Sequence, residues 1–224
     1  MVLQAKGLSY RTVEVTPGIG QVAVFRLSGQ RQVPVLVDGD TVLADSSTIA
    51  RHLEHLEPEP SLLPAEAKQA AQVHLIEDWA DTTLAAGGRA SLVQAAALDP
   101  DLRVALLPDD LPDPVRSVMG AIPGRWVNSV SELVNQGERA ALLASLEQLA
   151  ATVESSPWLV GESMTMADLA VAAQLSLLRF PSSAGSSLAG RGVPGLSDHP
   201  KLQSLFHWRD QLELKLMERT LEEV

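Results

Sequence analysis

Two short polar segments have residue types and spacing that could bind a small amino-acid-like ligand. In Gln32-Val33-Pro34, a proline falls near the start of a strand candidate that runs to Val37. Because proline cannot donate a ladder hydrogen bond, such a strand lies at a sheet edge or turns its neighbouring backbone toward a ligand. The sequence alone leaves both interpretations open, and it does not show whether the Val33–Pro34 bond is cis.

The second segment, Asp45-Ser46, begins a predicted helix directly after a predicted strand. A carboxylate, a hydroxyl and the free N–H groups of a helix start then converge on one spot. Such a cluster can bind the ammonium and carboxylate groups of an amino acid together. The alternative is that these residues only cap the helix. Capping and ligand binding are also compatible with each other.

Two further groups of residues are interpreted as structural. Thr165-Met-Ala-Asp168 has the form of a capping box, in which Asp168 reaches back to the helix start, and we assign it no chemistry. His52 and His55 lie three residues apart on a predicted helix, where they could share a metal ion. No third ligand is evident near them, so we expect a solvated helix face and no metal site.

The elements that position the first two segments are α/β in character. The pattern predicts strands over 10–15, 33–37 and 41–44, with helices over 21–27 and 46–56. Asp38-Gly39 is typical of a hairpin turn. The N-terminal part should therefore be a small sheet with helices packed on it.

A proline-rich stretch from Glu57 to Pro64 separates this part from the rest of the chain. We therefore predict a first domain over 1–57, a linker over 58–64 and an all-helical domain over 65–224. The helical pattern predicts helices over 65–84, 138–154, 165–179 and 199–222, of which 165–179 is apolar nearly all round and should be buried. The segments 99–137 and 181–200, rich in Pro, Gly, Asp or Ser, have no clear assignment.

Composition excludes several classes of function. The formal net charge of −11 gives no electrostatic attraction toward DNA, RNA or anionic lipid. The chain has no cysteine, which excludes disulfides, thiolate metal sites and a cysteine nucleophile within it. No apolar run approaches the roughly 18–20 residues of a membrane span, and Met1 to Lys6 has no signal-peptide layout. We expect a cytoplasmic protein that binds neither nucleic acid nor membrane.

Taken together, the motifs resemble the glutathione S-transferase family. The resemblance is carried by Val33-Pro-Val-Leu36, by Asp45-Ser46 opening a helix, and by the proline-rich link before a helical domain. Within that second domain it is carried by Ser156-Pro-Trp-Leu-Val-Gly161, Thr165-x-x-Asp168, and His199-Pro-Lys-Leu202 before Trp208. It covers nearly the whole chain and implies a thioredoxin-like first domain, here incomplete, followed by an all-α domain.

The resemblance also implies roles for individual residues. Val33, next to a cis Pro34, would pair through its backbone with the cysteinyl part of glutathione. Asp45 and Ser46 would hold the γ-glutamyl end, and Gln32 would contact the glycyl carboxylate. A small hydrophobic electrophile would bind against the 65–84 helix. From its length and its aromatic content, we expect the 99–137 segment with Trp126 to cover that electrophile. Members of the family usually form homodimers, so we expect one here.

The sequence departs from the family at its start. The family begins with a strand, a loop carrying a thiol-activating Ser, Tyr or Cys, and a first helix. Met1 to Tyr10 instead resembles the end of that helix, closed by Gly7 and running into the second strand. By typical element lengths, roughly twenty residues of the family pattern are not represented. Ser9 and Tyr10 lie away from the expected thiol position, so we name no catalytic residue.

The function implied by the resemblance is conjugation of the glutathione thiolate to small electrophiles, as in detoxification. The activating residue would lie outside this sequence, so the 224-residue chain should bind glutathione weakly and conjugate little. One alternative is a non-catalytic interaction or stress-response module. A third keeps glutathione but changes the reaction to peroxide reduction, isomerisation or dehalogenation.

Overall fold

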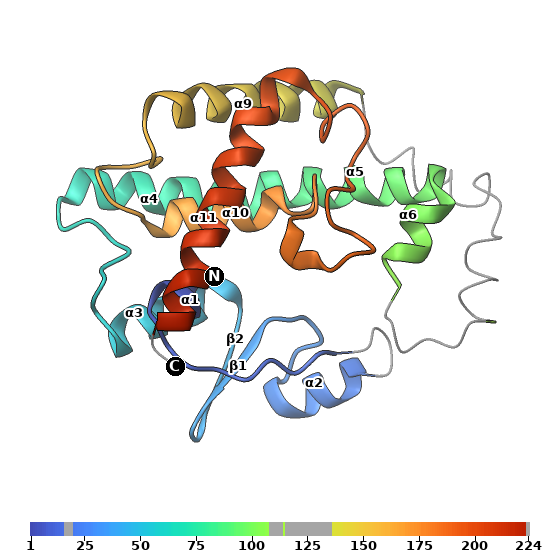
Figure 1. The fold of residues 1–224 in the computed structure, drawn as a ribbon. Helices are drawn as coiled ribbons and strands as arrows, with labels where there is room; N and C mark the ends of the chain where they lie inside the picture. The colour runs from blue at the N-terminus through green and yellow to red at the C-terminus, as the bar shows by residue number, and fades with distance from the viewer. Residues whose placement is uncertain (16–19, 108–113, 115–135, 223–224) are drawn as a thin grey trace. The chain divides into compact units, whose positions relative to one another are not determined.

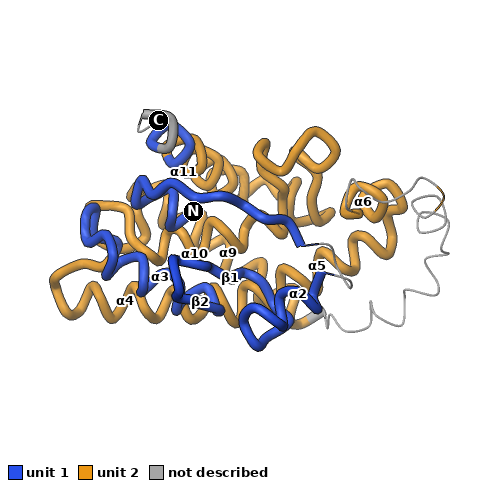
Figure 2. The backbone as a smooth tube through the Cα atoms, turned by 90° about the horizontal axis from the view of Figure 1, so that it is seen from below, with its two compact units in different colours: residues 1–62, 216–224 blue, residues 63–215 orange. Residues whose placement is uncertain are grey.

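The computed structural model of the chain describes residues 1–15, 20–107, 114 and 136–222. Two compact units are present: unit 1 consists of residues 1–62 and 216–224, and unit 2 consists of residues 63–215 (Figure 2). Unit 1 therefore contains the predicted α/β part together with the end of the last helix. Unit 2 is helical throughout the part that can be described, apart from turns and one isolated bridge.

Unit 1 is built around a β-hairpin (Figure 1). Its elements in chain order are α1 (Val2–Ala5), α2 (Gly20–Ser28), β1 (Val35–Asp38), β2 (Thr41–Ala44) and α3 (Ser46–Leu56). The antiparallel register runs from Val35↔Ala44 at one end to Asp38↔Thr41 at the turn. The predicted hairpin is confirmed, and β2 and α3 have the predicted bounds.

The strand predicted over 10–15 is wrong, because this segment has no regular secondary structure. Its composition suits a strand, but a strand forms only where a neighbour shares its ladder hydrogen bonds. In the described part of the chain the sheet consists of β1 and β2 alone. The segment is exposed over most of its length, including Tyr10 and Val13. β1 also begins at Val35, two residues later than predicted, because Pro34 has no N–H to donate.

The short helix α1 ends as predicted at a glycine. Gly7 has a φ of +66°, which glycine adopts without steric cost. Its N–H donates to the carbonyl of Gln4 (3.1 Å), and the N–H of Leu8 donates to that of Leu3 (2.9 Å). This pair of bonds is the Schellman motif, which satisfies the last carbonyls of a helix.

A buried ion pair ties α1 to the rest of unit 1. The fully buried ammonium of Lys6 lies 2.6 Å from Oε2 of Glu54 on α3 and donates to the carbonyl of Pro60 (2.8 Å). The other carboxylate oxygen of Glu54 accepts from the hydroxyl of Ser61 (3.0 Å) and the N–H of Leu62 (2.9 Å). We call this group of residues the Lys6–Glu54 network. It joins α1 to α3 and to the segment after α3, both of which are distant from α1 in sequence.

Unit 2 is organised around one apolar core. Its elements are α4 (Ala67–Trp79), a π-helical turn (Ala80–Leu84), α5 (Ala85–Leu98), α6 (Pro100–Ala105), α9 (Gln136–Ser155), α10 (Met166–Leu175), two 3₁₀ turns (Ser182–Ala184 and Pro200–Leu202) and α11 (Gln203–Glu222). α11 continues past the unit boundary at residue 215. Within the described ranges no helix is long and apolar enough to cross a membrane.

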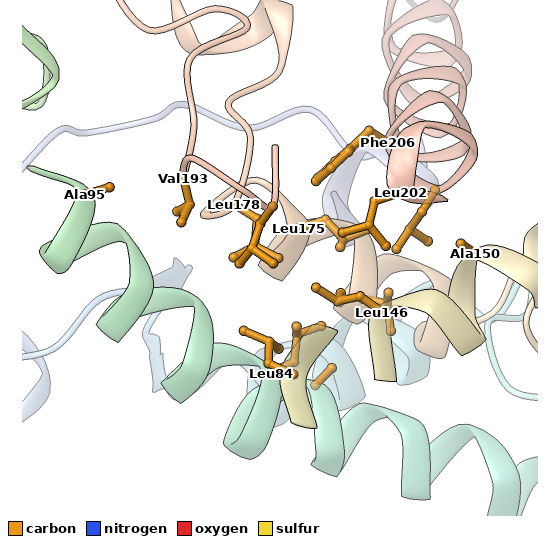
Figure 3. Packing of buried hydrophobic residues seen from close by; sticks show 14 of the residues in the cluster. Leu84, Ala95, Leu146, Ala150, Leu175, Leu178, Val193, Leu202 and Phe206 are labelled. Carbon is orange, nitrogen blue, oxygen red and sulfur yellow. The ribbon is translucent and has the colours of Figure 1, made fainter. Parts of the chain in front are cut away.

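The predicted buried helix is confirmed as α10, although it ends at Leu175, four residues earlier than predicted. Its residues are buried on almost every side, and Leu175 packs in a cluster with Leu146 of α9 and Phe206 of α11 (Figure 3). Gly88 of α5 is buried and lies against the side chains of Leu177 and Leu178, which follow α10. The clear amphipathic stripe predicted over 138–154 also lies on a helix, α9, which is two residues longer at its N-terminal end.

Candidate functional site

The hairpin register brings the two predicted ligand-binding segments together at one end of the sheet. Val35 and Ala44 form the last pair of the ladder. The chain before Val35 and the chain after Ala44 therefore leave the hairpin at the same end. Gln32-Val33-Pro34 lies on one of these chains and Asp45-Ser46 on the other. All five residues are exposed, so their polar groups are accessible to a ligand.

Asp45 has the most unusual backbone of the described non-glycine residues. Its φ of +81° with ψ of +126° lies outside the regions that L-residues normally occupy. Such conformations cost about 1–3 kcal/mol and persist only where the surrounding structure imposes them. Here Asp45 is the single residue between the end of β2 at Ala44 and the start of α3 at Ser46, so the change of chain direction falls on it. Its Oδ1 accepts the N–H of Thr48 at 2.9 Å, which makes it the N-cap of α3.

The start of α3 provides a site for opposite charges. The N–H of Ser46 is in the first turn, where it has no acceptor inside the helix. It lies at the positive end of the helix dipole, which favours a carboxylate, and the Ser46 hydroxyl is beside it. The second carboxylate oxygen of Asp45 remains beside these donors as an acceptor for a cation. The pair can therefore bind a carboxylate and an ammonium that share one carbon atom.

The segment before β1 offers backbone groups. The Val33–Pro34 peptide bond is cis, and the Val33 side chain is 61% exposed. Val33 precedes the first paired residue, so its N–H and C=O take no part in the β1–β2 ladder. Among the residues that can be described, no other backbone group bonds to them. The Val33 N–H can therefore donate one hydrogen bond to an extended ligand backbone, and the Val33 C=O can accept one from it.

The predicted capping box has a defined geometry in unit 2. The Asp168 carboxylate accepts the N–H of Thr165 (2.7 Å), the Thr165 hydroxyl (2.8 Å) and the N–H of Leu159 (2.8 Å). Burial raises the pKa of the Asp168 carboxyl above its usual value, and the hydrogen bonds from Leu159 and Thr165 partly oppose this effect. All its acceptor sites serve the polypeptide, so the group is structural.

The other candidate residues are not part of this constellation. His52 pairs through Nε2 with Asp38 Oδ2 at 2.9 Å, between α3 and the turn end of the hairpin. Across the described ranges, no group of three His, Asp or Glu side chains is arranged to hold a metal ion. Ser9 and Tyr10 lie in the irregular segment after α1. Trp126 and most of 99–137 lie outside the described residues.

Sequence reasoning missed two features of unit 1. No sequence pattern indicated the Lys6–Glu54 network, because its ionic partners are far apart in the chain. The backbone strain of Asp45 was weakly indicated, because the predicted strand and helix left a single residue between them in which the chain could change direction. That residue was identified as a cap, but its positive φ was not predicted.

Comparison with known proteins identifies the family. A model described as "Glutathione S-transferase, N-terminal domain" matches residues 1–61, and one described as "Glutathione S-transferase, C-terminal domain" matches residues 123–207. Together they match about two thirds of the chain. The chain belongs to the glutathione S-transferase family, with a thioredoxin-like N-terminal part and a helical C-terminal domain.

Solved structures show the same fold. A glutathione S-transferase from Rhodospirillum rubrum is 25% identical, with a TM-score of 0.62 over 94% of this chain and 79% of that one. A theta class glutathione S-transferase from Xanthomonas axonopodis pv. citri, solved with glutathione bound, is 21% identical, with a TM-score of 0.56 over 98% of this chain and 87% of that one.

A curated relative is also similar over part of its length. The Stringent starvation protein A homolog of Pasteurella multocida is 31% identical over 84 residues, which are 35% of this chain and 40% of that protein. The match thus spans well under half of the relative.

Proposed function

We propose that this chain binds glutathione at the open end of the β1–β2 hairpin. The observation that supports it most is the convergence of Val33-Pro34 and the strained Asp45-Ser46 at the last rung of the ladder. Glutathione carries an α-ammonium and an α-carboxylate on its γ-glutamyl end, which suit Asp45 and the start of α3. Its cysteinyl backbone can then pair with Val33, and its glycyl end extends toward Gln32.

The reaction that we propose for this site is conjugation to a small hydrophobic electrophile. The thiolate sulfur would form a bond to an electrophilic carbon, with loss of the leaving group, and the thiol proton would pass to solvent. A thiol with a pKa near 8.5 is mostly protonated at neutral pH, so the rate depends on how far bound glutathione is activated. We further propose that the protein acts as a cytoplasmic homodimer in detoxification.

Binding is tested by titrating glutathione into the purified chain and measuring heat. We expect Asp45→Asn, which preserves a capping oxygen but removes the charge, to weaken binding by about 10- to 100-fold, as expected for loss of a charged hydrogen bond. Ser46→Ala should weaken it less. Asp40→Asn is the matched control, because this acid lies at the turn end of the hairpin. Equal affinity in all four proteins would overturn the proposed site.

A second function is favoured by the curated relative, whose name refers to starvation. In this alternative the chain is a non-catalytic interaction or stress-response module of the same fold. Conjugation of 1-chloro-2,4-dinitrobenzene, followed by absorbance, separates the two. Conjugation that is weak, as expected for this chain, but above the uncatalysed rate and lost in Asp45→Asn supports a transferase. Glutathione binding with conjugation at the uncatalysed rate supports the module.

A further inference from the structure

Helix α2 presents its apolar side chains outward. It has nine residues, of which Val24 is buried, while Val22 is 54% exposed and Phe25 51% exposed. At about 100° per residue, Val22 and Arg26 lie almost opposite Val24, and Phe25 lies between these two directions. An isolated helix of this length is marginal in water, and most helices are stabilised by burying their apolar face. α2 buries little of its own.

Two arginines border this surface. Arg26 is in the last turn of α2, and the guanidinium of Arg31 lies 5.9 Å from the centroid of the Phe25 ring, within cation–π range. Both side chains are exposed. We call Val22, Phe25, Arg26 and Arg31 the α2 patch, after the helix that is labelled α2 in Figure 1.

The charge of the α2 patch is opposite to that of the whole chain. The formal net charge is −11, yet no acidic residue occurs between Glu14 and Asp38, and Arg26 and Arg31 are the two charged residues of that interval. An apolar centre bordered by cations complements a segment with apolar anchors and acidic flanks. A second copy docking patch to patch would oppose arginine to arginine, so the patch does not complement itself.

We propose that the α2 patch is a docking surface for an acidic amphipathic helix of a partner protein. Apolar side chains of the partner cover Val22 and Phe25, and its carboxylates pair with Arg26 and Arg31. A peptide segment touches only the patch, whereas an anionic bilayer would bring the remaining negative surface within a Debye length. The charge pattern therefore favours a protein partner over a lipid surface. This inference does not depend on glutathione binding.

The test uses the full chain and two labelled probes. The acidic probe is an 18-residue amphipathic helical peptide with Leu and Phe on one face and Glu on the other. In the control probe every Glu is replaced by Lys. We expect fluorescence anisotropy to show binding of the acidic probe in the micromolar range, at least tenfold weaker binding of the basic probe, and weaker binding at higher salt. Hydrogen exchange should slow in residues 20–31 when the acidic probe is bound.

Variants connect the binding to the patch. Phe25→Ser and Arg31→Glu should each weaken the acidic probe by at least tenfold. Leu75→Ser on α4, which is 71% exposed, and Arg89→Glu on α5, also exposed, are matched controls in unit 2 and should leave the affinity unchanged. All six side chains of the patch and controls are at the surface, so these variants should fold, which circular dichroism verifies.

Three outcomes of the peptide-binding experiments would overturn the proposal. The first is that the acidic probe does not bind at concentrations up to about 0.1 mM. The second is that both probes bind equally well. The third is that the unit 2 control variants also lose affinity. Binding to phosphatidylglycerol vesicles that depends on Arg31, without binding to the acidic probe, would assign the patch to lipid instead and also overturn it.

Discussion

Units 1 and 2 are stabilised in different ways. Unit 2 has a continuous apolar cluster that joins α5, α9, α10 and α11. Unit 1 buries few apolar side chains and also contains the buried Lys6–Glu54 network. Most of the exposed large apolar side chains of the described residues also lie on unit 1, including Tyr10, Val13 and Phe25. The proposed ligand-binding groups thus lie on the unit with the smaller core.

The contrast teaches where a substitution should matter most. In an apolar core, the loss of stability increases with the side-chain volume removed and decreases when the neighbouring side chains can relax into the space. When one member of a buried ion pair is removed, the loss of stability comes from the remaining charge, which is buried without a partner. The four tryptophans all lie between residues 63 and 215, so tryptophan fluorescence reports on unit 2. Hydrogen exchange of 1–62 reports on unit 1.

The largest expected effect is in unit 1. Glu54→Ala should lower the free energy of unfolding of this unit by about 3–5 kcal/mol, because it leaves the buried Lys6 ammonium without its ionic partner. Hydrogen exchange in residues 1–62 should accelerate, while tryptophan fluorescence in urea changes little. The double variant Lys6→Met with Glu54→Leu should recover most of the loss. A loss below about 1 kcal/mol in Glu54→Ala would contradict the importance of the network.

A similar or slightly smaller effect is expected in unit 2. Leu146→Ala removes a fully buried side chain from the apolar cluster and should cost about 2–5 kcal/mol. Urea unfolding followed by tryptophan fluorescence measures it. Leu75→Ala removes the same atoms from an exposed position on α4 and should change stability by no more than about 0.5 kcal/mol. Equal losses in the two variants would mean that burial does not govern this unit.

The next effect depends on pH. The pKa of Asp168 is raised above 3.8 by burial, so the folded chain retains a proton that the unfolded chain releases between 3.8 and the raised value. The contribution of this group to stability is therefore greatest below 3.8 and falls as pH rises through that window. Asp168→Asn does not titrate there. The stability difference between wild type and this variant should shrink across the window.

Urea unfolding of both proteins at a series of pH values measures this difference. At neutral pH the variant should still be less stable by about 1–3 kcal/mol, because its amide group faces the N–H of Thr165 and leaves donors unsatisfied. A difference that grows with pH would be opposite in sign to this expectation and would show that the hydrogen bonds to Asp168 outweigh its burial.

The smallest expected effect on stability is at the candidate ligand site. Asp45→Gly relieves the positive φ and loses the cap to Thr48, which glycine replaces at a cost of only a few tenths of a kcal/mol. The free energy of unfolding should therefore stay the same or increase, by less than about 1 kcal/mol. Glutathione affinity should fall as in Asp45→Asn. A large destabilisation would mean that Asp45 is retained for structure alone.

The local elements were largely predictable from sequence. The hairpin turn at Asp38-Gly39, the cap and bounds of α3, the end of α1 at Gly7 and the buried α10 all depend on residues within a few positions of one another. The spacing of these residues in the sequence is therefore enough to predict the elements. The candidate site followed in outline, because its two segments flank one hairpin and share an end of it.

The remaining features depend on tertiary structure. Residues 10–15 have the composition of a strand, but a strand requires partner hydrogen bonds that no local pattern supplies. The strain at Asp45 arises because β2 and α3 meet there with no spare residue. Lys6 and Glu54 are 48 positions apart, and only folding brings their charges together. The sequence by itself thus determined the family, the hairpin and several helices, including α3 and α10, whose interactions are local, whereas the bounds of α5 and α6 were not predicted. The buried ion pair, the two-stranded sheet and the outward apolar face of α2 were decided by which surfaces the folded chain brings into contact.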